Sequence, residues 1–238
     1  MGRVWSVDAI AKNDSTSIFG AAIALSESPL VEGLSYVGTD DGVISVTEDN
    51  GANWRRRDTT RGVPDMTLVE DIIASVHDGD VAYAVFDNHK RNDHKPYVFR
   101  TDNRGGSWRD ISGDLPDWGS VHTIAEDHID PDLLFVGTEF GLFYSQNGGR
   151  NWQALKTGFP TIDVRDIEIQ RRENDLVVGT FGRGIYVLDD YSALRTSTEA
   201  LAQTEATLFP VRDSWIYIEG DLWGPAGGAK ACIGDNFW

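Results

Sequence analysis

Carboxylate residues occupy the same place in two short turns of this sequence. Asp40 and Asp41 follow the dipeptide Gly-Thr and precede a glycine, and Glu139 follows the same dipeptide. Glycosidases use two carboxyl groups roughly 5 to 9.5 Å apart, one to protonate the leaving oxygen and one to attack or to activate water. Asp40 or Asp41 together with Glu139 supplies such a pair if the two turns converge. The alternative is that these acidic residues only form solvated turns.

Three further charged residues are candidates for binding a ligand. Asp163 and Arg165 precede a strand–turn–strand segment, and Arg183 lies in its turn. A guanidinium can hold a carboxylate through two parallel hydrogen bonds, so the two arginines are the residues best suited to an anionic ligand group. Asp163 offers acceptor oxygens at the same place. We expect these side chains to lie with the acidic turns at one end of the fold.

The segment of residues 87–96 is the longest insertion between two strand candidates. Its polar residues His89, Asp93 and His94 make it a candidate binding loop, because long loops on rigid scaffolds often contact partners. Their spacing matches no specific zinc pattern, so we predict no metal and no cofactor. A solvated loop is the alternative. His77, His122 and His128 lie on or next to strands, where we interpret them as packing or surface residues.

The elements that position these residues are organised around one motif of eight residues that occurs three times. It reads hydroxyl residue, any residue, Asp or Asn, any residue, Gly, any two residues, Trp. Its key positions are Thr47, Asp49, Gly51 and Trp54; Thr101, Asn103, Gly105 and Trp108; and Ser145, Asn147, Gly149 and Trp152. A partial fourth copy is Gly2-Arg3-Val4-Trp5. A near-constant period of about 50 residues is typical of a repeat architecture.

The residue types of the motif suit a turn between two strands. The Asp or Asn oxygen accepts hydrogen bonds from backbone N–H groups a few residues on. The glycine adopts a positive φ that other residues resist, and the tryptophan starts the next strand and buries its ring against a neighbour. We therefore interpret these twelve residues as structural.

Each repeat also contains a hairpin built on Gly-Thr. The three copies cover residues 34–46, 134–144 and 176–188. Each repeat also begins with a further strand candidate, and these four candidates lie at residues 19–26, 71–77, 121–127 and 166–170. Together with the strand after the motif, this predicts four antiparallel strands per repeat. Four-stranded repeats stacked radially form a β-propeller, with complete blades at residues 17–58, 66–112 and 118–156 and a partial blade at 162–190.

The motif resembles the Asp-box, or bacterial neuraminidase repeat, of sialidases, xyloglucan-cleaving hydrolases and sortilin-like receptors. The chain also resembles the C-terminal half of the second propeller in large bacterial glycosyl-hydrolase-like repeat proteins. The segments that carry this resemblance include residues 8–14, Val37-Gly38-Thr39-Asp40-Asp41-Gly42, Lys95-Pro96-Tyr97, Val178-Gly179-Thr180-Phe181-Gly182-Arg183-Gly184 and Leu208-Phe209-Pro210. Phe181 stands where that family commonly has His, which argues against proton transfer at this position.

The resemblance implies an all-β fold in which residues 1–195 are propeller blades, part of a ring of roughly six to eight. It implies that residues 196–238 are an extension, the start of a β-sandwich-like segment. It places the Asp-boxes at the periphery, away from the ligand pocket. The leading hypothesis is a non-catalytic scaffold that binds carbohydrate or peptide. A glycoside hydrolase is the alternative, although the Phe/Tyr-Arg-Ile-Pro signature of sialidases is absent.

The composition limits the kinds of partner that the chain can bind. The formal charge of −17 argues against nucleic acid, whose phosphates such a surface repels. No apolar run is long enough to span a membrane. Cys232 is the only cysteine, so the sequence permits no disulfide within the chain and leaves the compartment open. A secreted or envelope location follows only if a parent protein carries a signal peptide. Exposed blade edges predict possible self-association.

Overall fold

The computed structural model describes residues 20–156, 158–196, 206, 208–210, 219–221 and 230–232. The chain divides into two compact units, Met1–Ser197 and Thr198–Trp238. In the second unit, strands β16 (Glu219–Asp221) and β17 (Lys230–Cys232) form an antiparallel pair. The partial motif at residues 2–5 and most of the expected extension lie outside the described residues. The sandwich-like segment therefore stays a prediction.

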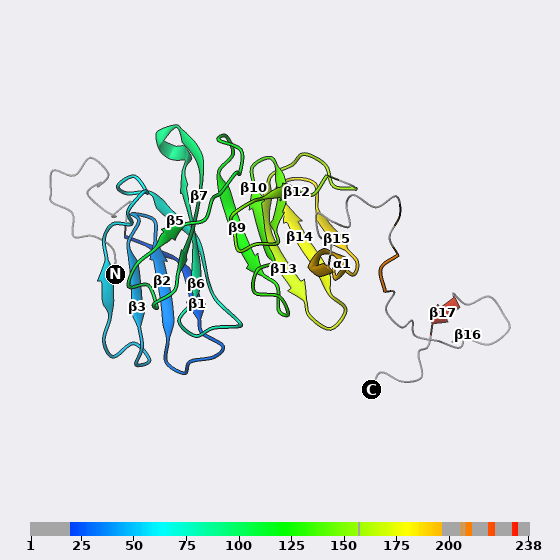
Figure 1. Ribbon diagram of the computed structural model, residues 1–238, viewed down its shortest axis with the longest axis horizontal. Coiled ribbons are helices and arrows are strands. Elements are labelled where there is room, and N and C mark those ends of the chain that lie inside the picture. Colours follow the sequence, from blue (N-terminus) through cyan, green and yellow to red (C-terminus); the bar gives the residue numbers. More distant parts are fainter. Residues whose placement is uncertain are drawn as a thin grey trace. The chain divides into compact units, whose positions relative to one another are not determined.

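The first unit contains three antiparallel sheets of four strands, each formed by strands consecutive in the chain (Figure 1). The first sheet contains β1 (Ala22–Glu27), β2 (Ser35–Thr39), β3 (Ile44–Thr47) and β4 (Arg55–Arg57). The second contains β5 (Leu68–Ala74), β6 (Ala82–Asn88), β7 (Asp93–Thr101) and β8 (Arg109–Asp110). The third contains β9 (Val121–Glu126), β10 (Leu134–Thr138), β11 (Gly141–Ser145) and β12 (Gln153–Ala154).

A fourth sheet contains β13 (Val164–Gln170), β14 (Asp175–Thr180) and β15 (Ile185–Leu188), and no fourth strand pairs with β15 among the described residues. The short helix α1 (Ala193–Thr196) follows it. In the part of the chain that the structure describes, no helix has the length and apolar character needed to cross a bilayer.

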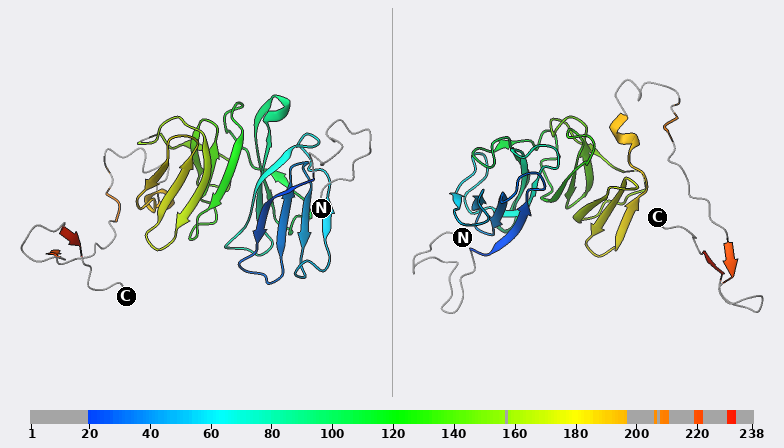
Figure 2. Two further views of the ribbon diagram at one scale, coloured as in Figure 1. Left: turned by 180° about the vertical axis from the view of Figure 1, so that it is seen from behind. Right: turned by 90° about the horizontal axis from the view of Figure 1, so that it is seen from below.

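The sheets pack face to face, with one hydrophobic core between each neighbouring pair (Figure 2). The core between the first and second sheets includes Tyr36 and Phe99, the next includes Tyr83 and Ile124, and the third includes Phe135 with residues of the fourth sheet. Strand β6 is buried along its whole length, as expected for a strand covered on both faces. Small antiparallel sheets stacked by their faces are propeller blades. The all-β propeller prediction is confirmed.

The three eight-residue motifs have one shared geometry. In the second copy the Thr101 hydroxyl accepts the Gly105 N–H at 2.9 Å, and the Asn103 side-chain oxygen accepts the Ser107 N–H at 2.7 Å. The corresponding bonds in the other two copies measure between 2.8 and 2.9 Å. The three glycines have φ of +86°, +75° and +85°, which favours glycine at this position. An asparagine therefore makes the same backbone bond as an aspartate.

The tryptophans of the motif differ from one copy to the next. Trp108 and Trp152 are buried in the cores between the first and second and between the second and third sheets. Each ring packs toward the preceding sheet. Trp54 is partly exposed, because it belongs to the first described sheet and no described sheet precedes it. The expectation that each ring is buried therefore fails for Trp54.

The insertion at residues 87–96 is more ordered than a solvated loop. Strand β6 runs to Asn88, a 3₁₀ turn η1 covers His89–Arg91, and β7 begins at Asp93. The Asn88 amide donates to the Asp93 carboxylate at 2.9 Å, and the Tyr97 hydroxyl donates to it at 2.8 Å. These bonds extend the β6–β7 pair across most of the segment. The inner strand β5 also begins earlier than expected, which leaves His77 beyond its end.

Candidate functional site

Each sheet has two distinct ends. The turn between its second and third strands lies at one end, which we call the loop end. The third strand leads away from that turn, so the eight-residue motif lies at the opposite end, which we call the motif end. The connections from one sheet to the next return to the loop end. Asp40, Glu139, Asp163 and Arg183 all lie in loop-end segments.

The innermost strands of the second, third and fourth sheets each have a register shift near the loop end. The shift falls between Val69 and Asp71 in β5, at the step from Val121 to Thr123 in β9, and between Val164 and Asp166 in β13. The extra residues are Glu70, His122 and Arg165. They are structurally equivalent in three consecutive sheets. A bulge of this kind redirects a side chain and is common beside functional sites.

His122 is buried, and its ring lies between two carboxylates. Its side chain is 2% exposed, and neither ring nitrogen has a hydrogen-bond partner among the described residues. Nε2 lies 3.4 Å from Asp163 Oδ1, and Nδ1 lies 3.9 Å from Glu70 Oε1. Asp163 Oδ1 is likewise buried without a described hydrogen-bond partner. Buried polar atoms are nearly always hydrogen-bonded, so a buried pair without a described partner is an unusual feature of this part of the fold.

The charges around His122 perturb the pKa of two groups. Burial, with a contribution from the Arg165 charge, holds the pKa of His122 below its usual value, against the opposing effect of Asp163, Asp87 and Glu139. The ring is therefore neutral at pH 7. Burial, supported by the Asp87 charge, raises the pKa of Glu70. Perturbed ionisable groups that share one location are typical of functional sites.

We call Glu70, Asp87, His122, Glu139, Asp163 and Arg165 the rim cluster. Arg165 forms a two-bonded ion pair with Asp163, at 2.9 Å from Nε and 2.7 Å from Nη2. Its guanidinium carbon also lies 5.7 Å from the centre of the Phe181 ring. Asp163 and Arg165 were predicted from the sequence as ligand-binding residues, and the structure brings them together.

Asp87 connects the cluster to the β6–β7 turn. The His89 N–H donates to Asp87 at 2.9 Å, and the His89 ring also bonds the same carboxylate. Burial acts to raise the pKa of Asp87, but these bonds outweigh it, so the pKa lies below its usual range. His89 thus contacts the cluster through Asp87.

Glu139 lies at the edge of the cluster beside an aromatic group. Its Oε2 atom is 3.4 Å from His94 Nδ1 and accepts the Ser120 N–H at 3.3 Å. The His94 ring stacks on Trp118 with centroids 4.7 Å apart. A negative charge and an exposed indole therefore lie next to each other at the loop end of the third sheet.

The other predicted site residues lie apart from the rim cluster. Asp40 accepts the N–H groups of Gly20 and Ala21 at 2.6 and 2.9 Å, and Asp41 is fully buried and accepts the Thr39 hydroxyl at 2.5 Å. Both belong to the first sheet, whereas Glu139 belongs to the third, with the second sheet between them.

Asp93 and Arg183 lie in two separate turns. Asp93 bonds Asn88 and Tyr97 within its own hairpin, and these hydrogen bonds hold its pKa below the usual value although its partial burial acts to raise it. Arg183 is exposed in the β14–β15 turn. Neither residue has a side-chain bond to a member of the rim cluster among the described residues.

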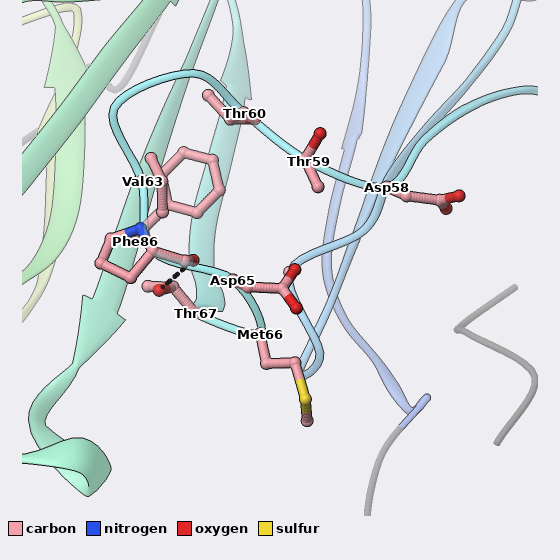
Figure 3. Close-up of a pocket in the computed structure, with 10 residues that line it drawn as sticks. Asp58, Thr59, Thr60, Val63, Asp65, Met66, Thr67 and Phe86 are labelled. Atoms are coloured by element: carbon pink, nitrogen blue, oxygen red, sulfur yellow. Dashed lines mark hydrogen bonds between the residues drawn. The ribbon is translucent and has the colours of Figure 1, made fainter. Parts of the chain in front are cut away.

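A pocket of about 410 Å³ opens between the first two sheets. The loop from Asp58 to Thr67 forms most of its wall, and Phe86 of β6 closes one side. Figure 3 shows Val63 beside Phe86, with Asp58 on the far side of the loop. The pocket offers hydroxyl and carboxylate groups.

Among the described residues no three His, Cys, Asp or Glu side chains are arranged to hold a metal ion.

Sequence reasoning missed Glu70 and His122 as site residues. A signal for them exists in the repeats, which align as Val69-Glu70-Asp71-Ile72, Val121-His122-Thr123-Ile124 and Val164-Arg165-Asp166-Ile167. The variable second position of this pattern is the bulged residue. The first and fourth positions repeat as Val and Ile, whereas the second carries a different ionisable residue in each copy, as expected for a position that is free to recognise a ligand.

No protein-family model matches this sequence, and no curated protein matches it. Several solved structures do match it. A GH74 xyloglucanase from Xanthomonas campestris aligns with a TM-score of 0.56 at 16% identity over 73% of this chain and 30% of its own. A GH74 enzyme from Niastella koreensis aligns with a TM-score of 0.58 at 11% identity over 72% and 29%.

A structure of YCF48 bound to D1 peptide aligns with a TM-score of 0.54 at 17% identity, over 71% of this chain and 51% of its own. The chain spans between about a third and a half of the length of these proteins. At such identities the similarity shows the fold alone. This chain is a set of β-propeller blades like those of GH74 enzymes and YCF48.

Proposed function

We propose that this propeller is a recognition scaffold that binds a carbohydrate or a peptide at its loop end, without catalysis of its own. The observation that carries the proposal is the rim cluster, which gathers the buried His122 ring and the carboxylates of Glu70, Asp87, Glu139 and Asp163 at the loop end. Both ligand classes supply hydroxyl or N–H donors for the carboxylates of this cluster. Pockets that orient a ligand combine a few such polar groups with aromatic walls.

Exposed aromatic rings favour a carbohydrate. Trp118, Phe140 and Phe181 are 61%, 48% and 70% exposed, and all three lie in loop-end segments of the second to fourth sheets. A pyranose ring presents an apolar face of C–H groups that stacks on an aromatic face, while its hydroxyls bond polar side chains at the edge. Phe181 lies beside Arg165, so stacking and polar recognition are available together.

The test is a binding titration of the chain with neutral and amino oligosaccharides and with short peptides. Phe181→Ala is expected to weaken oligosaccharide binding about tenfold, or roughly 1.4 kcal/mol. Ile129→Ala is the matched control, because Ile129 is also an exposed apolar residue and lies in the β9–β10 connection at the motif end. Equal effects of the two substitutions, or no binding by any oligosaccharide or peptide, contradict the proposal.

A glycoside hydrolase is the second candidate. Glu70, whose pKa is raised by burial, and Asp163 lie next to the two nitrogens of one imidazole ring, and glycosidases use a pair of carboxyl groups, one of them with a raised pKa. The sequence also named the pair of Asp40 or Asp41 with Glu139, and these residues lie on the first and third sheets. Turnover of chromogenic glycosides that is abolished by Glu70→Gln or by Glu139→Gln supports a hydrolase. No turnover by the unaltered chain rejects it for this chain.

Two structural proposals accompany the function. The shared hydrogen-bond pattern of the three eight-residue motifs supports their assignment as Asp-boxes. Self-association through exposed blade surfaces is supported by β15, whose outer edge has no partner among the described residues and which exposes Ile185 and Val187. Unpaired strand edges are a common surface for pairing with another chain.

A further inference from the structure

An exposed tryptophan at the loop end has one open ring face. Trp118 lies in the connection between β8 and β9 and is 61% exposed. The His94 ring of β7 stacks on it, with centroids 4.7 Å apart and ring planes at 21°. The next N–H, that of Gly119, donates to the His94 carbonyl at 2.8 Å and holds the connection against β7. One face of the indole is thus supported by a second ring, and the other is available to a ligand.

The backbone brings a carboxylate and a second aromatic ring to the same place. The Glu139 N–H donates to the Ser120 carbonyl at 3.0 Å, and the Ser120 N–H donates to Glu139 Oε2 at 3.3 Å. Gly119 has a φ of +134°, and a Cβ added to it would lie 3.0 Å from the Phe140 ring. Phe140, which is 48% exposed, therefore packs over this glycine. Trp118, Glu139 and Phe140 thus surround one short stretch of chain.

Glu139 presents an oxygen that a ligand can reach. Its side chain is 27% exposed, and Oε2 is the oxygen that lies 3.4 Å from His94 Nδ1. Oε1 accepts no hydrogen bond from a described residue, and it is not one of the buried oxygens that lack such a partner. Oε1 is therefore open to solvent, in contrast to Asp163 Oδ1, which is covered.

The charge of Glu139 has no lysine or arginine paired with it among the described residues. Its ion-pair partner is His94, which is charged only when protonated. Lys95 follows His94 on β7, but successive side chains of a strand point to opposite faces, and its charge acts on Asp93. The formal charge of −17 on the whole chain also attracts a cation to this surface.

An open aromatic face beside an accessible carboxylate fits a guanidinium group. The arginine side chain is planar and weakly hydrated, so it stacks on an aromatic ring while its N–H groups bond a carboxylate. A lysine ammonium is a strongly hydrated point charge and stacks less well. A neutral sugar also stacks on an indole, but it gains nothing from the charge. The aromatic rings by themselves favour a carbohydrate, whereas ring and carboxylate together favour arginine.

We propose that the loop end of the third sheet binds an arginine side chain of a peptide, with the guanidinium stacked on the open face of Trp118 and donating to Glu139 Oε1. The alkyl part of the side chain contacts Phe140. This inference rests on the proposed function, of whose two ligand classes it selects the peptide. It assigns Glu139 to ligand binding, whereas the sequence suggested a catalytic carboxylate.

The experiment compares peptides that differ at one side chain. The full chain is titrated by calorimetry with capped glycine pentapeptides that carry arginine, lysine or citrulline at the centre, and with a glucose tetramer. Citrulline has the planar shape of arginine without its charge. The arginine peptide is expected to bind about tenfold more tightly than the citrulline peptide, with an advantage that falls as salt rises. The lysine peptide is expected to bind more weakly than the arginine peptide.

Two substitutions separate the charge from the ring. Glu139→Gln is expected to remove most of the advantage of arginine over citrulline, and Trp118→Ala to weaken both peptides by roughly threefold to tenfold. Glu168→Gln is the matched control for charge, because Glu168 is an exposed glutamate on β13. Trp54→Ala is the control for the ring, because Trp54 is partly exposed at the motif end. Both controls should leave the affinities unchanged, and thermal melting checks that all four variants fold.

The outcomes distinguish this inference from the proposed function. Equal affinity of the arginine and citrulline peptides, or an arginine advantage that survives Glu139→Gln, overturns the inference and leaves the scaffold function standing. Lysine binding as tight as arginine binding overturns the stacked guanidinium. Tighter binding of the glucose tetramer, lost in Trp118→Ala, also overturns the inference and assigns the ring to a carbohydrate. Absence of binding by every peptide and every oligosaccharide rejects the proposed function itself.

Discussion

At the scale of the residue, Asp127 is the clearest case of a carboxylate that is both buried and ionised. Arg195 of helix α1 donates to both of its carboxylate oxygens at 2.7 Å, and the Tyr191 hydroxyl donates at 2.5 Å. Burial acts to raise the pKa of Asp127, but these bonds outweigh it and lower the pKa to about 2. Asp127 thereby ties the segment after the fourth sheet to the third sheet.

Asp127 should make the free energy of unfolding depend on pH. Because its pKa is lower in the folded state than in the unfolded chain, its contribution is present above about pH 4 and is lost as the pH falls toward 2. We expect Asp127→Asn to lower the free energy of unfolding by about 2 kcal/mol at pH 7 and by much less at pH 2. Urea unfolding at both pH values measures this.

Asp117→Asn is the control for Asp127, because Asp117 is exposed in the loop between the second and third sheets. It should change the free energy of unfolding little at either pH. A loss for Asp127→Asn that is the same at pH 2 as at pH 7 would show that the ionised carboxylate is not the source of the stability.

At the scale of the element, the Gly-Thr hairpins allow two sheets to approach closely. A Cβ added to Gly137 would lie 2.5 Å from Val164 Cγ1 and 2.8 Å from Thr123 Cγ2, and one added to Gly38 would lie 2.4 Å from Val69 Cγ1. The glycine of this hairpin thus provides room for the valine that opens the next inner strand. Gly38 and Gly137 do not have a positive φ, so the backbone conformation does not require glycine at these positions. The close contact between sheets does.

Gly137→Ala and Gly179→Ala test this explanation as a matched pair. Gly179 is the equivalent position in the fourth sheet, where the nearest neighbour of an added Cβ is Asp166 Cβ at 3.4 Å. We expect Gly137→Ala to lower the free energy of unfolding by roughly 1 to 3 kcal/mol because of overpacking, and Gly179→Ala to change it by less than about 0.5 kcal/mol. Chemical denaturation measures both. Equal losses would point to the backbone instead of the sheet contact.

At the scale of the molecule, the described blades leave two sheet faces without a neighbouring sheet. The first sheet exposes Ile23 and Leu25, and the fourth exposes Ile185 and Val187. The interior sheets bury the corresponding faces in the three cores. Exposed apolar sheet faces beside an unpaired edge favour association, and the formal charge of −17 opposes it through repulsion.

The balance between these two effects can be measured by light scattering. We expect the chain to form species heavier than its 26.3 kDa at high protein concentration and moderate salt. Val187→Lys should shift the mass back toward the monomer, since a lysine on an edge strand blocks pairing. Gln153→Lys, on the polar edge strand β12, is the control for added charge. A monomeric mass for the unaltered chain at every concentration would exclude this association.

The sequence alone determined the repeat, the hairpins and the eight-residue turns, because each depends on groups only a few residues apart. The bond from Ser107 N–H to Asn103 spans four positions and needs no other part of the fold. For the same reason the blades and their four strands could be predicted. Asp163 and Arg165 were found together because they are neighbours in the chain.

Only the tertiary structure decided which side chains share one site. Glu70 and His122 are 52 positions apart in the sequence. They lie close together because each is the extra residue of a bulge and because their two sheets pack face to face. The same stacking sets Asp40 and Glu139 on non-neighbouring sheets. Burial by the neighbouring sheets also lowers the pKa of His122 and raises that of Glu70. This burial cannot be predicted from the residues near them in the sequence. The candidate site is therefore a property of the packing between blades.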